Sequence, residues 1–243
     1  MSNQSNLSRF GSLLIRVLGG FEVEVDGSRK VVPTNVARTL AYLAITGRAQ
    51  TRHAVAGTLW GDSSEARASA SLRTALWRSR LILGDCIESC GSHLLLSDSV
   101  EVDLRSFEER SRRLLDGEAR LQSLDCDPRC LSSDLLPGWD EEWLLFERER
   151  LHQLRVHALE AMSRRLALIG DTAKAVDAGL AAVAADPLRE TAQHVLIGAY
   201  LLEGNISEAR RQFESYRDLL WESIRLEPSE QLRYLIGPSL RAS

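Results

Sequence analysis

Residues 59–80 read LWGDSSEARASASLRTALWRSR, and this stretch decides how the first part of the chain folds. Aspartate and serine come first and glutamate follows in the next turn, which is the usual start of a helix. The side chains of the predicted core face then recur at helical spacing: Ala68, Leu72, Leu76, Ser79 and Leu83. The pattern predicts a helix that begins near Asp62 and ends near Leu83.

The opposite face of this helix combines arginines with small and hydroxyl-bearing side chains: Arg67, Ala70, Ser71, Arg73, Thr74, Trp77 and Arg78. Such side chains fit the major groove of DNA, whereas a bulky acidic face would not. For a helix considered alone, an ordinary solvated face would be the simpler explanation. The turn before the helix and the hairpin after it favour DNA contact instead. Trp77 leaves two alternatives open: contact with DNA, or packing beneath the hairpin.

The neighbouring segments complete a winged helix, in which a β-hairpin (the wing) follows the recognition helix. Three strands and two helices are predicted before residue 62, at 13–20, 21–25, 30–32, 34–45 and 52–59. Asp26-Gly27 is a strong signal for a hairpin turn between two of these strands. After the recognition helix, residues 87–97 are expected to form the wing, and a short strand at 100–103 closes the unit.

Two further pairs of residues near this helix are candidates for DNA contact. Thr51 and Arg52 begin the second helix, where backbone amides and a hydroxyl favour a phosphate. A plain helix cap at Thr51 explains the same residues equally well. Ser92 and His93 lie at the wing tip, where they could enter a minor groove. A metal-binding or pH-sensing role for His93 is not favoured, because its sequence neighbours supply no ligand set.

The composition indicates two domains with different partners. The chain has 243 residues, of which 44% are hydrophobic, enough for one large core or two modest ones. Its first 100 residues hold 11 Arg and Lys against 8 Asp and Glu, and the remaining 143 hold 19 against 26. No run of 18 apolar residues is present, and the N-terminus does not resemble a signal peptide. We therefore expect a cytoplasmic protein without membrane contact.

From residue 104 onward the sequence shows only helical patterns. Helices are expected at 104–115 and 141–169, with a loop-rich stretch at 116–138 between them. The motif GDTAKA at 170–175 recurs as GNISEA at 204–209, and this offset of 34 residues is the tetratricopeptide period. Arrays of this kind present a concave surface to protein partners.

The sequence offers little catalytic or metal-binding chemistry. It has no Gly-x-Ser-x-Gly nucleophile motif and no glycine-rich phosphate loop, so we expect neither enzymatic activity nor a cofactor. Two Cys-x3-Cys pairs, Cys86/Cys90 and Cys126/Cys130, have a spacing that zinc sites use. The first pair falls on a predicted strand, where residues four apart lie too far from each other to chelate one ion. Reduced cytosolic thiols are therefore the expected state, and no metal site is predicted.

Residues along nearly the whole chain resemble the Streptomyces antibiotic regulatory protein type of transcriptional activator. The front motifs are LGGF at 18–21, LAYLA at 40–44, LW at 59–60, ARA at 66–68 and LRTALWR at 72–78. The rear motifs are DLLPGW at 134–139, FERERL at 146–151, DPLRE at 186–190, GN at 204–205 and EA at 208–209. The resemblance implies an OmpR-like winged helix followed by the bacterial transcriptional activation domain. Ser79 departs from the pattern, which usually has leucine there, and Asn35 stands near a position that is often basic.

The resemblance also implies a mechanism. Such proteins bind direct repeats of double-stranded DNA close to a promoter as side-by-side protomers, and they recruit RNA polymerase through its sigma and alpha subunits. Carried over by position, the residues that would read the groove are Arg67, Ser71, Thr74 and Arg78. The wing around Ser92 and His93 would touch the DNA backbone, and the turn Trp60-Gly61-Asp62 would face the polymerase.

The sequence thus predicts an α+β winged-helix domain at 13–103, after a disordered segment at 1–12, and an all-α tetratricopeptide-like domain at 104–243. The predicted function is sequence-specific activation of transcription at the nucleoid, controlling a secondary-metabolite gene cluster. Two alternatives stay open. The helical array could be a ligand- or peptide-sensing device to which DNA binding is secondary. The chain could also be an adaptor without DNA binding, which would require the recognition face to be covered.

Overall fold

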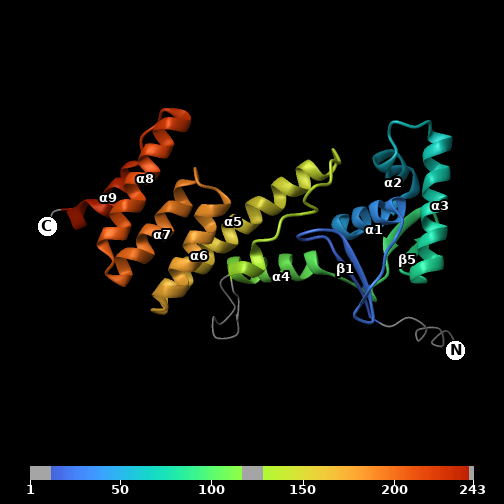
Figure 1. The fold of residues 1–243 in the computed structure, drawn as a ribbon, viewed down its shortest axis with the longest axis horizontal. Helices are drawn as coiled ribbons and strands as arrows, with labels where there is room; N and C mark the ends of the chain where they lie inside the picture. Colours follow the sequence, from blue (N-terminus) through green and yellow to red (C-terminus); the bar gives the residue numbers. More distant parts are fainter. Residues whose placement is uncertain (1–11, 117–127, 241–243) are drawn as a thin grey trace. The chain divides into compact units, whose positions relative to one another are not determined.

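The computed structural model describes residues 12–116 and 128–240 (Figure 1). The chain forms two compact units: Met1–Phe107 with Asp134–Arg148 is the first, and Glu108–Ser133 with Glu149–Ser243 is the second. Of the segment 1–12 that was predicted to be disordered, residues 1–11 lie outside the described residues, and so does Cys126. The predicted domain limits of 13–103 and 104–243 stay a prediction. The two compact units divide the chain differently, since the first also includes Asp134–Arg148.

The first unit opens with a four-stranded sheet in the order β3-β2-β1-β7, made of β1 (Leu13–Arg16), β2 (Glu22–Val25), β3 (Ser28–Arg29) and β7 (Val100–Val102). β1 and β2 are antiparallel, whereas β1 and β7 are parallel. Asp26 and Gly27 both have positive φ, 52° and 73°, so a two-residue turn joins β2 to β3. The predicted strand at 30–32 is wrong: β3 follows this tight turn directly and consists of Ser28 and Arg29 alone.

Three helices follow: α1 (Thr34–Thr46), α2 (Arg52–Leu59) and α3 (Glu65–Leu83). α3 begins at Glu65 after the cap residue Ser64, three residues later than predicted, because residues 60–63 form a turn closed by the Ser63 N–H donating to Trp60 O over 3.0 Å. Its buried side chains are Ala68, Leu72, Ala75, Ser79 and Leu83. Leu76 is only half-buried, so the core face is turned slightly from the predicted one.

The wing is formed by β5 (Ile87–Cys90) and β6 (His93–Leu96), an antiparallel pair joined through Gly91 at a φ of 61°. A short strand that the sequence analysis did not predict, β4 (Gln50–Thr51), pairs with β6 and completes a second sheet. Cys86 is buried beside Ser79, with 3.3 Å between Sγ and Oγ, and burial raises the pKa of its thiol. Cys90 is exposed, and the described residues contain no cluster of metal-ligating side chains.

Asp103 joins the sheet to the helix that follows it, α4 (Asp103–Asp116). Its carboxylate accepts hydrogen bonds from the backbone N–H groups of Val17 and Leu18, at 2.9 Å and 3.1 Å. Burial raises the pKa of this carboxyl, although the backbone donors oppose the shift. Asp103 therefore satisfies two backbone donors at the point where β1 ends.

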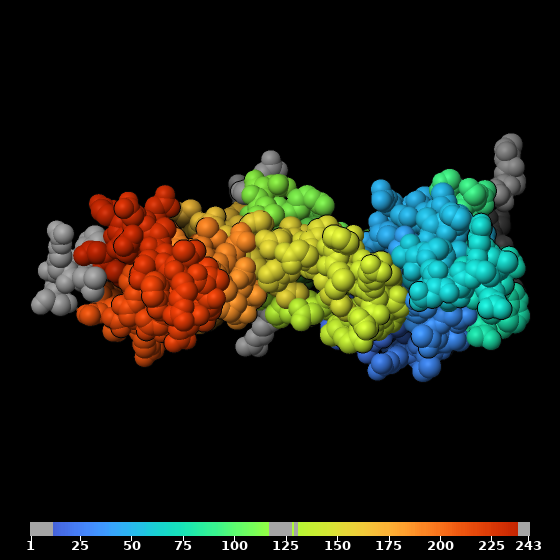
Figure 2. Space-filling model, turned by 90° about the horizontal axis from the view of Figure 1, so that it is seen from above, coloured from blue at the N-terminus to red at the C-terminus, as the bar shows by residue number. Residues whose placement is uncertain are grey.

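The Asp134–Arg148 segment returns to the first unit and packs against it. Gly19 N–H donates to Asp134 O over 2.7 Å, and Leu136 N–H donates to Val17 O over 2.9 Å. The helix that starts in this segment, α5 (Leu144–Leu168), begins three residues later than the predicted Glu141. In the space-filling view the yellow-green residues of this segment border the blue residues of the N-terminal part (Figure 2).

The second unit is helical, with η2 (Pro128–Leu131), the later turns of α5, α6 (Thr172–Ala185), α7 (Glu190–Glu203), α8 (Ile206–Ile224) and α9 (Glu230–Leu240). Gly170 and Gly204 have nearly identical φ values of 82° and 83°, and a helix starts two residues after each, so the predicted repeat of 34 residues is present in the backbone. Helices α6 and α7 pack closely at Gly179, where an added Cβ would lie 3.0 Å from the Cα of Leu196. No described helix is both long and apolar enough to cross a membrane.

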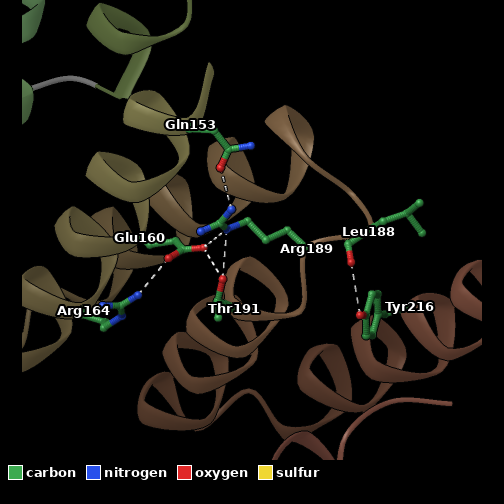
Figure 3. A network of polar contacts seen from close by, with 7 residues as sticks. All are labelled: Gln153, Glu160, Arg164, Leu188, Arg189, Thr191 and Tyr216. Carbon is green, nitrogen blue, oxygen red and sulfur yellow. Dashed lines mark hydrogen bonds and ion pairs between the residues drawn. The ribbon is translucent and has the colours of Figure 1, made fainter. Parts of the chain in front are cut away.

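A buried carboxylate links the two repeats (Figure 3). Glu160 of α5 accepts hydrogen bonds from Arg164, Arg189 and Thr191 at 3.0, 2.8 and 2.6 Å, and Arg189 also donates to Gln153 over 3.0 Å. A buried charge is tolerated only when it is paired and hydrogen-bonded, which is the case here. The network therefore fixes the loop before α7 against α5.

Replacement of Asp103 tests the junction between β1 and α4. Asp103→Ala should lower the free energy of unfolding by about 1–3 kcal/mol, because two backbone donors lose their acceptor. Asp103→Asn keeps one acceptor oxygen and should cost less. The measurement is urea denaturation of the three proteins.

The pH dependence of the free energy of unfolding provides a second test with the same variants. Because the folded-state pKa of Asp103 is raised, its protonated form favours the fold. The stability of the wild type relative to Asp103→Asn should therefore fall as the pH rises from 3.8 through the raised pKa. A relative stability that instead increases with pH would contradict this assignment.

Candidate nucleic-acid interface

The exposed face of α3 presents the side chains that the sequence analysis selected, and Figure 2 shows the cyan residues of this part of the chain at the surface. Six of the seven are exposed and Ser71 is half-buried; the exposed ones are Arg67, Ala70, Arg73, Thr74, Trp77 and Arg78. With the other described residues, Arg67, Arg73 and Arg78 form no ion pair or hydrogen bond. Their guanidinium groups are therefore available for phosphates or for the O6 and N7 acceptors of guanine.

Thr74 has a more restricted role than an unpaired hydroxyl. Its Oγ1 donates to Ala70 O over 3.0 Å, which uses the hydroxyl proton within the helix. The oxygen can still accept a hydrogen bond, and the methyl group can still make an apolar contact. An exocyclic amino group or a thymine methyl group would suit this side chain.

Trp77 lies at a groove between α3 and β5. Its side chain is 65% exposed, which rules out the alternative that it is packed beneath the wing. The groove has a volume of about 600 Å³, and Arg52, Arg73 and Arg80 contribute to its lining together with Asp85 and Glu88. Its charge is therefore mixed, with the arginines of α2 and α3 facing acidic residues near the wing.

The start of α2 and the wing tip lie together. Arg52 N–H donates to Ser92 O over 2.8 Å, its Nη2 donates to Ser89 Oγ over 3.0 Å, and Thr51 pairs with His93 across β4 and β6. Thr51 Oγ1 accepts from Ala54 N–H over 3.1 Å, so its role as a helix cap is confirmed. The structure thus brings all four predicted residues outside α3 to one place.

The turn between α2 and α3 carries Trp60, Gly61 and Asp62. Gly61 and Asp62 are exposed and Trp60 is half-buried. Gly61 is held closely, because an added Cβ would lie 2.9 Å from the carbonyl oxygen of Gly57. The guanidinium of Arg38 lies 5.8 Å from the centre of the Trp60 ring, a contact that the sequence analysis missed. No local pattern could have shown it, since Arg38 belongs to another helix.

Comparison with known proteins assigns the family. Residues 102–237 match the family described as the bacterial transcriptional activator domain, and this match covers more than half of the chain. The chain belongs to this family. Two regulatory proteins named AfsR, from Streptomyces griseus and Streptomyces coelicolor, are each 28% identical to it, over 238 and 250 residues. The alignments cover 94% and 96% of this chain but 24% of each relative, so the chain spans about a quarter of their length.

A solved structure gives the same fold. Mycobacterium tuberculosis EmbR, in complex with a low affinity phosphopeptide, matches with a TM-score of 0.70 and 21% identity, over 97% of this chain and 66% of that one. The predicted fold class, a winged helix followed by a helical domain, is confirmed. The resemblance to the Streptomyces antibiotic regulatory protein type is confirmed as well. The family is one of transcriptional regulators.

Thr51 offers a direct test of the N-terminal cap of α2. Thr51→Ala should lower the free energy of unfolding by about 1 kcal/mol, because the Ala54 N–H loses its cap. Thr51→Ser keeps the hydroxyl and serves as the control. Thermal denaturation of the three proteins makes the comparison, and equal melting temperatures for Thr51→Ala and the wild type would show that the cap is not formed in solution.

Proposed function

We propose that the protein is a sequence-specific DNA-binding transcriptional activator. The observation that carries this proposal is the exposed face of α3, where three arginines without partners among the described residues stand beside a threonine and an exposed tryptophan. The adaptor alternative required this face to be covered, and the described part of the first unit leaves it open. Membership in a family of transcriptional regulators supports the same function.

The proposed contacts fall into two groups. Four side chains of α3 are proposed to read bases in the major groove: Arg67, Ser71, Thr74 and Arg78. The residues at the start of α2 and at the wing tip are proposed to hold phosphates: Thr51, Arg52, Ser92 and His93. Arg73 and Trp77 lie beside the groove between α3 and β5, where they would contact the sugar-phosphate backbone of the same strand.

The remaining steps of the proposal rest on the family. We place two protomers side by side on direct repeats near a promoter. The turn Trp60-Gly61-Asp62 then faces RNA polymerase, with the sigma and alpha subunits as the contacts. An activator of this kind works at the nucleoid in the cytoplasm, and a secondary-metabolite gene cluster is the proposed target.

The salt dependence of binding tests the basic premise. In gel shifts against promoters next to its own gene, the affinity should fall steeply between 50 and 200 mM salt, because phosphate contacts release counterions. A random duplex of the same length is the control. Affinity that is insensitive to salt, or equal for the two duplexes, would rule out the proposal.

Two arginine variants separate base contacts from phosphate contacts. Arg67→Ala should cost about 1–3 kcal/mol at the preferred site and relax the preference at one base position. Arg52→Ala should weaken binding to all sites alike. It should also make the slope of log affinity against log salt concentration less steep by about 1. Arg233→Ala, on an exposed residue of the second unit, makes the same charge change and should leave binding unaltered. The measurement is the binding constant of each variant for the specific and the random duplex. Equal binding constants for Arg67→Ala and Arg233→Ala on both duplexes would show that Arg67 does not contact DNA.

A second candidate function is ligand or peptide sensing by the helical array. One observation favours it: a pocket of about 230 Å³ in the second unit, lined by Arg164, Glu190, Thr191, His194, Val195 and Gln231. EmbR was solved in complex with a phosphopeptide, which is a property of that protein. A melting temperature of the full chain that rises with added acidic peptide would support sensing. A His194→Ala variant that responds equally would place the ligand elsewhere.

A further inference from the structure

The Asp134–Arg148 segment contacts α1 directly, and through Arg38 of α1 it is linked to the turn between α2 and α3. It lies within residues 102–237, which match the activator domain, yet it packs in the first unit with the winged helix. Trp139 packs on Phe21 with ring centres 5.5 Å apart, and Trp143 meets Tyr42 edge-on at 5.1 Å. Arg148 closes the segment by donating to the carbonyl oxygens of Leu135, Leu136 and Trp139.

An ion pair stands at the centre of this contact. Arg38 Nη2 donates to Glu141 Oε2 over 2.9 Å, and its Nε lies 2.5 Å from Oε1 in a geometry that does not suit a hydrogen bond. Trp143 Nε1 donates to the same Oε2 over 3.1 Å. The side chains of Arg38 and Glu141 are only 26% and 15% exposed, so water screens their attraction less than that of a surface pair.

The same guanidinium also holds the end of α2. Arg38 Nη2 donates to Leu59 O over 2.6 Å, and Leu59 is the last residue of α2, where carbonyl groups lack a partner within the helix. The guanidinium lies 5.8 Å from the Trp60 ring centre, within reach of a cation–π contact. One arginine therefore contacts the last residue of α2 and the first residue of the turn that follows, and Glu141 fixes that arginine.

We propose that Arg38 and Glu141 are positioning residues, through which the Asp134–Arg148 segment holds the turn Trp60-Gly61-Asp62 in the shape that activates transcription. The inference rests on the proposed function, in which this turn faces RNA polymerase. It assigns a part in activation to residues that touch neither DNA nor polymerase. It also separates DNA binding, which belongs to α3 and the wing, from activation, which depends on a contact with another stretch of the chain.

Glu141→Gln tests the inference with a small change. Glutamine keeps an acceptor for Trp143 but removes the charge that orients Arg38. The control is Glu142→Gln, the same change on the exposed neighbouring residue. We expect faster amide hydrogen exchange at Ser63, whose N–H closes the turn on Trp60 O, in Glu141→Gln but not in Glu142→Gln.

Activation is measured with purified RNA polymerase on a promoter that the wild type binds. Transcription activated by Glu141→Gln should be about 2- to 30-fold lower than by Glu142→Gln, the range found for residues that couple two sites, at unchanged DNA affinity. Arg38→Lys keeps the positive charge but loses the contact of Nε with Glu141 Oε1 and the planar guanidinium beside the Trp60 ring, so it should show the same loss. Equal activation by Glu141→Gln and Glu142→Gln, or a parallel loss of DNA affinity, would overturn the inference.

The two proposals fail in different ways. If the wild type neither prefers a promoter over random duplex nor raises transcription, the proposed function is wrong. The exchange measurement needs no polymerase and no DNA. An unchanged exchange rate at Ser63 in Glu141→Gln would show that Glu141 does not position the turn, whatever the protein activates.

Discussion

Five side chains of α3 are buried against the rest of the first unit, and three of them are small: Ala68, Ala75 and Ser79. Small residues let a helix lie close to its neighbours, so the angle at which α3 is rotated about its axis is set by packing with little slack. This rotation decides which side chains face solvent. The arginines that we assign to DNA are therefore exposed because the opposite stripe is buried.

Much of the first unit follows from its sequence because local signals agree there. Asp26-Gly27 has the residues that a tight hairpin turn needs, and Thr51 caps α2 as its hydroxyl allows. The predicted start of α3 near Asp62 was three residues early, since Asp62, Ser63 and Ser64 are all good cap residues. The turn closed by the Ser63 N–H on Trp60 O leaves Ser64 as the cap residue, a choice that the identities of the three residues do not make.

Contacts between distant segments were beyond the reach of pattern analysis. Arg38 and Glu141 are separated by 103 positions, and each looks like an ordinary charge on a helix face. The pairing of β4 with β6 was missed because a strand of two residues leaves no periodic pattern. For the candidate interface, the sequence could supply the side chains of α3, whereas the gathering of Thr51, Arg52, Ser92 and His93 depends on this unpredicted pairing.

The parallel pairing of β1 with β7 has a consequence for how such a domain can be used. Leu13 lies opposite Val100 and Ile15 lies opposite Val102, so the first and last strands of the winged helix are neighbours in one sheet. The chain therefore enters and leaves this domain within about one strand length, roughly 10 Å for three residues. A domain with adjoining ends can be joined to another module, or inserted into one, without rearranging its interior. The two ends of the winged-helix domain, at β1 and β7, therefore lie on a different sheet from the wing, so a connection to another module would not interfere with the wing.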